Sequence, residues 1–204
     1  MKLRFVAVTQ LTSLVILAVG LAGCPAQQGK VARTEVPPKQ NASSKADYRV
    51  KNIADGDTIT VIGSNDAEIK VRFACVDAPE VPHTIKERES RSFADRDQFK
   101  WGRQAQDRLT QLIHKGGDRV ALTVVDTDRY GRQVAEVRLP DGTLTQEVLA
   151  REGLAVVYRQ YIKNCPDAIA VEQAEAQAKQ RKMGVWGDSR FVTPSEWRRR
   201  NKQR

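Results

Sequence analysis

Acidic and basic side chains with complementary chemistry lie close together in this chain of 204 residues. Asp57 lies in A-D-G-D-T, and Arg72, Asp77 and Glu80 lie in V-R-F-A-C-V-D-A-P-E. Arg132 follows in D-T-D-R-Y-G-R. Carboxylates bind hard cations, and guanidinium groups bind phosphate oxygens through paired hydrogen bonds. Cleavage of a phosphodiester bond requires both, so these five positions form the candidate catalytic site.

Three of these residues also have a structural explanation. Asp57 follows a turn sequence, and Asp77 is placed to cap the end of a strand. Arg72 lies between two apolar strand residues, which predicts that its side chain points to the opposite, solvated face. Taken one at a time, these structural explanations are preferable. The case for a catalytic site therefore rests on the residues as a set.

The elements that must position this set begin with strands. Along residues 48–76, apolar residues alternate with polar ones, and glycine-containing turn sequences interrupt this pattern. The segment is therefore predicted to form consecutive strands joined by turns. A helix is expected at about 98–114, ending at a Gly-Gly pair, and further strands at about 119–126 and 131–139. The charged stretch 81–97 is predicted to be a long surface loop, either a substrate lid or a disordered segment.

The second half of the chain adds helices. Thr145 is predicted to cap a short helix that ends at Gly153, and a last helix is expected at about 167–183. The expected fold class is therefore α+β, with a five-stranded OB-type Greek-key β-barrel and about three helices.

The N-terminus is typical of an exported bacterial lipoprotein. Residues 1–23 read as a signal peptide with a basic start and an apolar run, and the L-A-G-C ending at Cys24 resembles a lipobox. An uncleaved anchor or a plain secretory peptide is the alternative. Lipidation of Cys24 would hold the protein on a membrane of the cell envelope, at a periplasmic or extracellular face.

The remaining domain boundaries follow from composition. Residues 24–46 are poor in large apolar side chains, which predicts a lipidated N-terminus with a flexible linker. Residues 47–187 are the expected folded domain. Residues 188–204 form a basic tail that is expected to be frayed and solvated.

The net charge of the chain indicates which kinds of partner it could bind. The chain has 34 Lys and Arg against 25 Asp and Glu, a formal charge of +9. This excess suits binding to nucleic acid or to an anionic membrane, although it is also explained by solubility alone.

The cysteine content allows one disulfide. With Cys24 lipidated, Cys75 and Cys165 remain. In an oxidising compartment these two form either a disulfide or a pair of thiols, and the sequence leaves both possibilities open.

Five motifs occur in a specific order: D-G-D-T at 55–58, R-F-x-x-V-D-A-P-E at 72–80, D-R-Y-G-R at 128–132, E-A-Q-A-K at 175–179 and G-V-W at 184–186. This ordered set closely resembles the staphylococcal nuclease (thermonuclease) family, over about residues 48–187. No single motif is specific enough, but the order of all five is.

The resemblance implies a calcium site and a general base. Asp57 and Asp77 match the family's side-chain calcium ligands. Ala78 stands where the family often has threonine; that residue contributes its backbone carbonyl, so the exchange should be tolerated. Glu80 matches the residue assigned as general base, an assignment that is debated within the family.

The resemblance also implies a substrate site. Arg72 and Arg132 match the two phosphate-binding arginines, and Tyr130 and Tyr161 match tyrosines that line the nucleotide pocket. Arg159 falls where the best-known member has a pocket tyrosine, so base stacking should differ. The loop after Glu80 is also longer than in that member.

Three functions are compatible with these observations. The resemblance implies a monomeric, calcium-dependent nuclease that cleaves DNA and RNA with little sequence specificity and leaves 3′-phosphate ends. The alternative is a non-catalytic OB-fold module that binds nucleic acid, although such relatives usually lack some of the acids or arginines. An envelope protein that binds anionic lipid would leave the polar cluster unexplained.

Overall fold

The computed structural model describes residues 47–202. The predicted signal peptide, the lipidation site Cys24 and the linker up to residue 46 lie outside the described residues. Residues 40–204 form one compact unit. Its buried apolar residues all lie between Ile59 and Trp197. Because this core is complete within the unit, we expect a protein of residues 40–204 to fold by itself.

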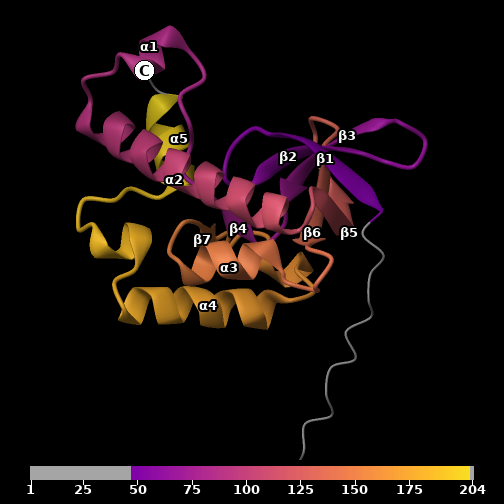
Figure 1. The fold of residues 1–204 in the computed structure, drawn as a ribbon. Helices are drawn as coiled ribbons and strands as arrows, with labels where there is room; N and C mark the ends of the chain where they lie inside the picture. Colours follow the sequence, from indigo (N-terminus) through magenta and orange to yellow (C-terminus); the bar gives the residue numbers. More distant parts are fainter. Residues whose placement is uncertain (1–46, 203–204) are drawn as a thin grey trace, which may run out of the picture. The chain divides into compact units, whose positions relative to one another are not determined.

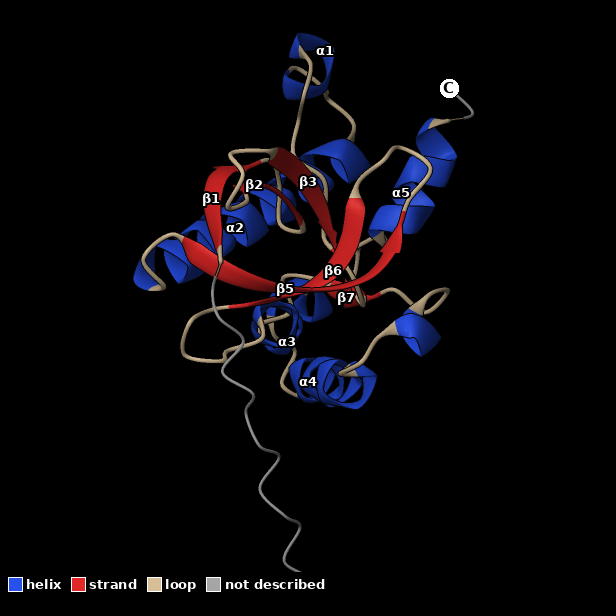
Figure 2. Ribbon diagram, turned by 90° about the vertical axis from the view of Figure 1, so that its right-hand side faces the viewer, coloured by secondary structure: helices blue, strands red, loops and turns tan. Residues whose placement is uncertain are grey.

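Five strands close into a barrel in the order β1-β2-β3-β6-β5 (Figures 1 and 2). The strands are β1 (Tyr48–Ile53), β2 (Thr58–Ile62), β3 (Glu68–Phe73), β5 (Arg119–Thr127) and β6 (Gln133–Arg138). All neighbouring strands are antiparallel except β3 and β6, which are parallel. This is the strand order of an OB-type barrel, and with several helices it confirms the predicted α+β fold class.

The barrel interior follows the period-two pattern of the sequence. Ile59 and Val61 on β2, and Val71 and Phe73 on β3, are almost fully buried, while their strand neighbours are only half-buried or exposed. Alternate side chains of a strand point to opposite faces, so one face fills the barrel. The other face carries Arg72 between Val71 and Phe73.

A second, two-stranded sheet lies beside the barrel. It pairs β4 (Val76–Asp77) with β7 (Val156–Val157). The bend between β3 and β4 is sharp, since Cys75 has a φ of 73°. A positive φ is uncommon for a residue with a side chain. This bend directs the chain from the barrel wall into the acidic segment that begins at Asp77.

The helices surround the barrel (Figure 1). They are α2 (Phe93–Lys115), α3 (Thr145–Arg151), α4 (Ala168–Gln180) and α5 (Pro194–Asn201), with the short α1 (Ile85–Arg88) and the 3₁₀ turns η1 (Ile162–Asn164) and η2 (Gly184–Gly187). Figure 2 shows α3 and α4 together on one side of the barrel. In α2, Ala105, Leu109, Leu112 and Ile113 are buried, as their helical spacing predicts.

The prediction of a structureless loop over residues 81–97 is wrong. Thr84 and Glu87 cap each other's backbone and start α1. Ser92 then caps α2, which begins at Phe93 rather than near residue 98. Capping side chains of this kind satisfy the free N–H groups of a first helical turn. The high charge of this stretch concealed those capping signals.

Two further predictions need correction. Thr145 does not cap α3 but is its first residue, and its hydroxyl donates to the backbone oxygen of Val137 at 3.0 Å. The basic tail is not frayed between residues 194 and 201. Thr193 caps α5 there, and Trp197 of α5 is buried. One apolar side chain within a basic run was enough to dock this helix.

Cys75 and Cys165 are joined in a disulfide across a sequence separation of 90 residues. Of the two possibilities that the sequence left open, this is the one that the structure contains. The bond ties the bend before β4 to the end of η1, and in that way connects the acidic segment to the segment that carries Tyr161. Closing a long loop restricts the unfolded chain and stabilises the fold.

Within residues 47–202 no helix is long and apolar enough to cross a membrane.

Candidate active site

The acidic cluster lies where the β1–β2 loop and β4 meet α2. Asp57 is 5% exposed and Asp77 is 1% exposed. The backbone N–H of Ala78 donates to a carboxylate oxygen of Asp57 at 2.5 Å. This bond brings together two segments that are 21 residues apart in the sequence. Asp57, Asp77, Ala78 and Glu80 therefore belong to one site, as the sequence predicted.

Arg72 holds the two aspartates around a single guanidinium group. Its Nη1 lies 2.5 Å from Oδ2 of Asp57, and its Nη2 lies 2.7 Å from Oδ1 of Asp77. The Arg72 side chain is only 13% exposed. The structural explanation for Arg72, a solvated residue on the outer face of β3, is therefore wrong. A buried guanidinium of this kind compensates the charge of both carboxylates.

Two glycines allow the acidic loops to approach α2. A Cβ atom on Gly56 would lie 2.5 Å from Cβ of Ala105 and 2.8 Å from Cβ of Ala78. A Cβ atom on Gly102 would lie 1.9 Å from the backbone oxygen of Glu80. Contacts this short do not occur in real structures, so neither position tolerates a side chain without displacement. The close packing against α2 therefore fixes the positions of the β1–β2 loop, which carries Asp57, and of Glu80.

Burial and mutual repulsion raise the proton affinity of the cluster. Burial and the charge of Asp57 raise the pKa of Asp55 to about 8. Burial also raises the pKa of Asp77, against the effect of Arg72, and raises the pKa of Glu80, against a hydrogen bond from Arg198. Negative charge is therefore concentrated at a place where water solvates it poorly. A cation bound there would relieve this repulsion.

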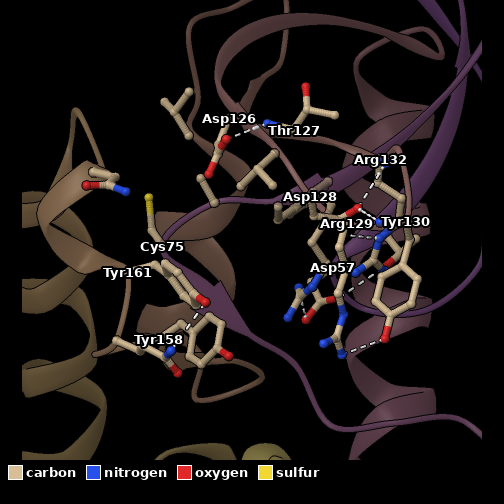
Figure 3. A pocket seen from close by; sticks show the side chains of 18 of the residues that line it. Asp57, Cys75, Asp126, Thr127, Asp128, Arg129, Tyr130, Arg132, Tyr158 and Tyr161 are labelled. Atoms are coloured by element: carbon tan, nitrogen blue, oxygen red, sulfur yellow. Dashed lines mark hydrogen bonds and ion pairs between the residues drawn. The ribbon is translucent and has the colours of Figure 1, made fainter.

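A cavity of about 720 Å³ opens next to the cluster. Asp57, Arg72 and Glu80 reach it from the acidic side. Arg132, Tyr130 and Tyr161 line it as well, so the structure brings the two predicted phosphate-binding arginines and the two predicted pocket tyrosines to the same cavity. Figure 3 shows Tyr158 and Tyr161 on one side of the opening, and Tyr130 with Arg132 on the opposite side.

The turn between β5 and β6 presents Arg132. Asp128 accepts the backbone N–H groups of Tyr130 (2.9 Å) and Arg132 (3.0 Å) through Oδ1, and the Nε of Arg132 (2.7 Å) through Oδ2. Gly131, with a φ of 76°, completes the turn. Asp128 therefore sets both the backbone and the direction of Arg132, while one edge of the guanidinium keeps its donors available.

The tyrosines differ from the acids in exposure. Tyr130 is 69% exposed and Tyr161 is 48% exposed. Tyr158 and Tyr161 meet edge to face, with ring centroids 5.1 Å apart. Exposed aromatic rings at the edge of a cavity offer faces on which bases can stack. Tyr158 also lines the cavity.

Sequence reasoning did not single out three residues of this site. Asp55 has a signal in the sequence, since it forms a D-G-D motif with Asp57. Asp128 has one too, as the first residue of D-R-Y-G-R. The third, Arg198, is one of three consecutive arginines in α5 and has none. Only the packing of α5 in the folded protein distinguishes Arg198 from Arg199 and Arg200, because it directs the Arg198 side chain to the acids.

Arg198 bonds to both of the acids that flank Pro79. Its Nη1 donates to Oε1 of Glu80 at 2.6 Å, and its Nη2 lies 2.9 Å from Oδ1 and 2.8 Å from Oδ2 of Asp77. These acids raise the pKa of Arg198, although burial acts in the opposite direction. The predicted solvated tail thus contributes a side chain to the centre of the site.

Several known proteins with similar sequences are described as nucleases. A family described as "Staphylococcal nuclease homologue" matches residues 70–188. The chain is 36% identical over 152 residues to an "Uncharacterized endonuclease" of Escherichia coli, covering 74% of this chain and 84% of that protein. It is 34% identical over 167 residues to "Micrococcal nuclease" of Shigella flexneri, covering 77% and 84%. It is 31% identical over 160 residues to "Endonuclease YncB" of Bacillus subtilis, covering 77% and 69%.

Proposed function

Because this chain belongs to the staphylococcal nuclease family, we propose that it is a calcium-dependent nuclease. It hydrolyses phosphodiester bonds of DNA and RNA with little sequence specificity and leaves 3′-phosphate ends. The observation that carries this proposal is the pair Asp57 and Asp77, held on either side of the Arg72 guanidinium next to a cavity that Arg132 also lines.

The donor set fits a hard divalent cation. Asp57, Asp77 and the backbone carbonyl of Ala78 offer only oxygen atoms, which are the ligands that calcium prefers. The raised pKa of Asp77, caused mainly by burial, indicates that its negative charge is poorly solvated. Calcium held by these groups would supply positive charge to a phosphate oxygen and lower the pKa of a bound water.

The other polar residues have separate roles in the proposed reaction. Glu80 orients the attacking water and accepts its proton, and burial raises the pKa of this carboxyl towards neutrality, which suits a general base. Arg72 and Arg132 bind oxygens of the scissile phosphate from two sides and neutralise the charge that grows there in the transition state. Both guanidiniums line the cavity, which supports a shared phosphate.

The exposed aromatic residues that line the cavity determine which nucleic acids the enzyme prefers. Tyr130 and Tyr161 expose ring faces, which stack on any base and therefore favour single-stranded or frayed nucleic acid without sequence readout. The net charge of +9 adds non-specific affinity for phosphates. We therefore expect the cleavage rate to fall as the salt concentration rises.

The proposal is tested by incubating residues 40–204 with end-labelled single-stranded and duplex oligonucleotides of DNA and RNA, in calcium or in chelator. Calcium-dependent cleavage is expected, with product ends that a 3′-phosphatase converts to hydroxyls. The Glu80→Gln variant should be slower by about 10²–10⁴-fold. Glu89→Gln, an exposed acid just outside the site, is the matched control and should cleave normally. Binding without cleavage would instead support the non-catalytic OB-fold module.

A location outside the cytoplasm is proposed from the sequence alone. Residues 1–23 would act as a lipoprotein signal peptide, and the lipidated Cys24 would anchor a monomeric enzyme to a membrane of the cell envelope. The disulfide between Cys75 and Cys165 supports this proposal, because such bonds persist mainly in oxidising compartments. A Cys24→Ala variant expressed in its host should appear in the soluble rather than the membrane fraction.

A further inference from the structure

Arg198 has no role in the proposed reaction, although it bonds to two of its central acids. It lies on α5, more than a hundred residues after them in the sequence, and its guanidinium makes three hydrogen bonds of 2.6–2.9 Å to Glu80 and Asp77. Charge-assisted hydrogen bonds of this length are among the strong ones in proteins. A contact of this strength at a metal-binding position needs an explanation.

Hydrogen bonds from two guanidiniums already occupy most of the carboxylate of Asp77. Oδ1 accepts from Arg72 at 2.7 Å and from Arg198 at 2.9 Å, and Oδ2 accepts from Arg198 at 2.8 Å. A carboxylate has about four lone-pair positions, so these three bonds leave little capacity for a cation. The residue is 1% exposed and does not line the cavity, so the departure of one guanidinium would both free acceptor positions and make room for a metal ion.

Arg198 is the guanidinium that can leave. Arg72 is anchored on β3 in the barrel wall, is 13% exposed and is also paired with Asp57. Arg198 is 34% exposed and already lines the cavity. Rotation of its long side chain would place the guanidinium in that cavity without any change in the barrel.

The charges support an exchange of cations. Asp57, Asp77 and Glu80 together with Arg72 carry a net charge of −2 when ionised. Arg198 compensates half of it, whereas a divalent cation compensates all of it. We propose that Arg198 is a resident cation of the acidic cluster that a divalent metal ion displaces, so that Arg198 sets the affinity of the site for its metal. This inference rests on the cation site of the proposed function.

Helix α5 itself stays docked in this exchange. The indole N–H of Trp197 donates to Oδ1 of Asp95 at 2.9 Å, and its ring meets Phe99 edge to face at 5.6 Å. The amide nitrogen of Gln98 donates to the backbone oxygen of Val192 at 3.1 Å, and its amide oxygen accepts from the backbone N–H of Glu80 at 3.2 Å. None of these contacts uses the carboxylate of Asp77 or Glu80, so only the Arg198 side chain needs to move.

Calorimetric titration of calcium into residues 40–204 tests the proposal without measuring cleavage. Arg198→Gln should bind calcium about tenfold tighter or more than the wild type, because the ion no longer displaces charged hydrogen bonds. Arg199→Gln removes the same charge from the same helix at a side chain that is 72% exposed, and should bind like the wild type. Arg198→Lys, which keeps the charge but not the fork of donors, should lie in between.

Thermal stability provides a second readout. In chelator, Arg198→Gln should melt below Arg199→Gln, because its buried acids have lost a counter-charge. Saturating calcium should remove this difference, since tighter binding stabilises the variant more. Equal calcium affinities in all four proteins, or weaker binding by Arg198→Gln, would overturn the proposal and leave the nuclease proposal intact. No calcium binding by any of them would overturn both.

Discussion

The two sides of the cavity are built in opposite ways. On the acidic side, Asp57 and Asp77 are at most 5% exposed, and Arg72 between them is also largely buried. The other side is the rim of the opening, where Tyr130 and Tyr161, which lie on opposite edges, are about half exposed or more. The acidic side is buried at the edge of the hydrophobic core, whereas the tyrosines are exposed side chains on turns.

This difference separates the chemistry from the binding of substrate. Groups that hold a cation or activate water must keep a fixed geometry, and packing against α2 through Gly56 and Gly102 provides it. Groups that hold many different nucleotides benefit from exposed rings on turns. Arg72 lies among the buried acids and Arg132 lies on the exposed β5–β6 turn, so the same residue type can be compared in both surroundings.

The largest effects are expected from these two arginines. Arg72→Ala should lower kcat/KM by about 10³-fold or more and destabilise the fold by about 3–5 kcal/mol, because the buried Asp57 loses its guanidinium partner and the buried Asp77 loses one of two. Arg132→Ala should lower kcat/KM by about 10²–10³-fold but cost less than about 1 kcal/mol of stability. Cleavage kinetics and urea unfolding measure both. Equal losses of stability would remove the distinction between the two sides.

Gly102→Ala tests whether the fit against α2 positions the acids. The new methyl group would meet the backbone oxygen of Glu80 at 1.9 Å, so the loop must shift. We expect a loss of about 1–3 kcal/mol in unfolding free energy, with a fall in kcat and little change in KM. Gln104→Ala, at an exposed position of the same helix, is the control. A fully active Gly102→Ala protein would show that the position of Glu80 is not critical.

Tyr130→Ala should act on binding alone. Loss of one stacking ring costs about 1–3 kcal/mol per base, so KM for a single-stranded oligonucleotide should rise while kcat stays unchanged. Stability should also be unchanged, since the ring is 69% exposed. A lowered kcat at saturating substrate would place Tyr130 in the chemistry and break the division between the two sides.

The pH dependence of stability also separates the two sides, because the pKa shifts of Asp55 and Asp128 differ in sign. The pKa of Asp55 is raised to about 8 by burial and by Asp57, so its contribution to stability is present at low pH and is lost as the pH rises from about 4 to about 8. The pKa of Asp128 is lowered: burial opposes this, but hydrogen bonds from Arg132 and Tyr130 prevail. Its contribution is lost as the pH falls below about 4.

Urea unfolding across pH checks these signs. Asp55→Asn should flatten the decline of stability as the pH rises from about 4 to about 8, and Asp128→Asn should flatten the decline as the pH falls below about 4. A variant that changed the opposite limb of the profile would contradict the assigned cause of its pKa shift.

The sequence predicted the barrel and the acidic cluster because both leave local signals. Strand alternation and turn residues mark β1 to β3, and the order of the motifs marks Asp57, Asp77 and Arg132. The capping box at Thr84 was also readable, although the surrounding charge outweighed it. Arg198 was not predictable, because its position depends on how Trp197 packs against Phe99, a contact between residues 98 positions apart that no local pattern encodes.

The central claim is that the buried acids hold the metal and the exposed side holds the substrate. Calorimetric titration of calcium into wild-type, Asp77→Asn and Arg132→Ala proteins tests it most directly. We predict that Asp77→Asn binds calcium at least about tenfold more weakly, whereas Arg132→Ala binds it like the wild type. Unchanged calcium binding by Asp77→Asn, or an equal loss in Arg132→Ala, would contradict the account.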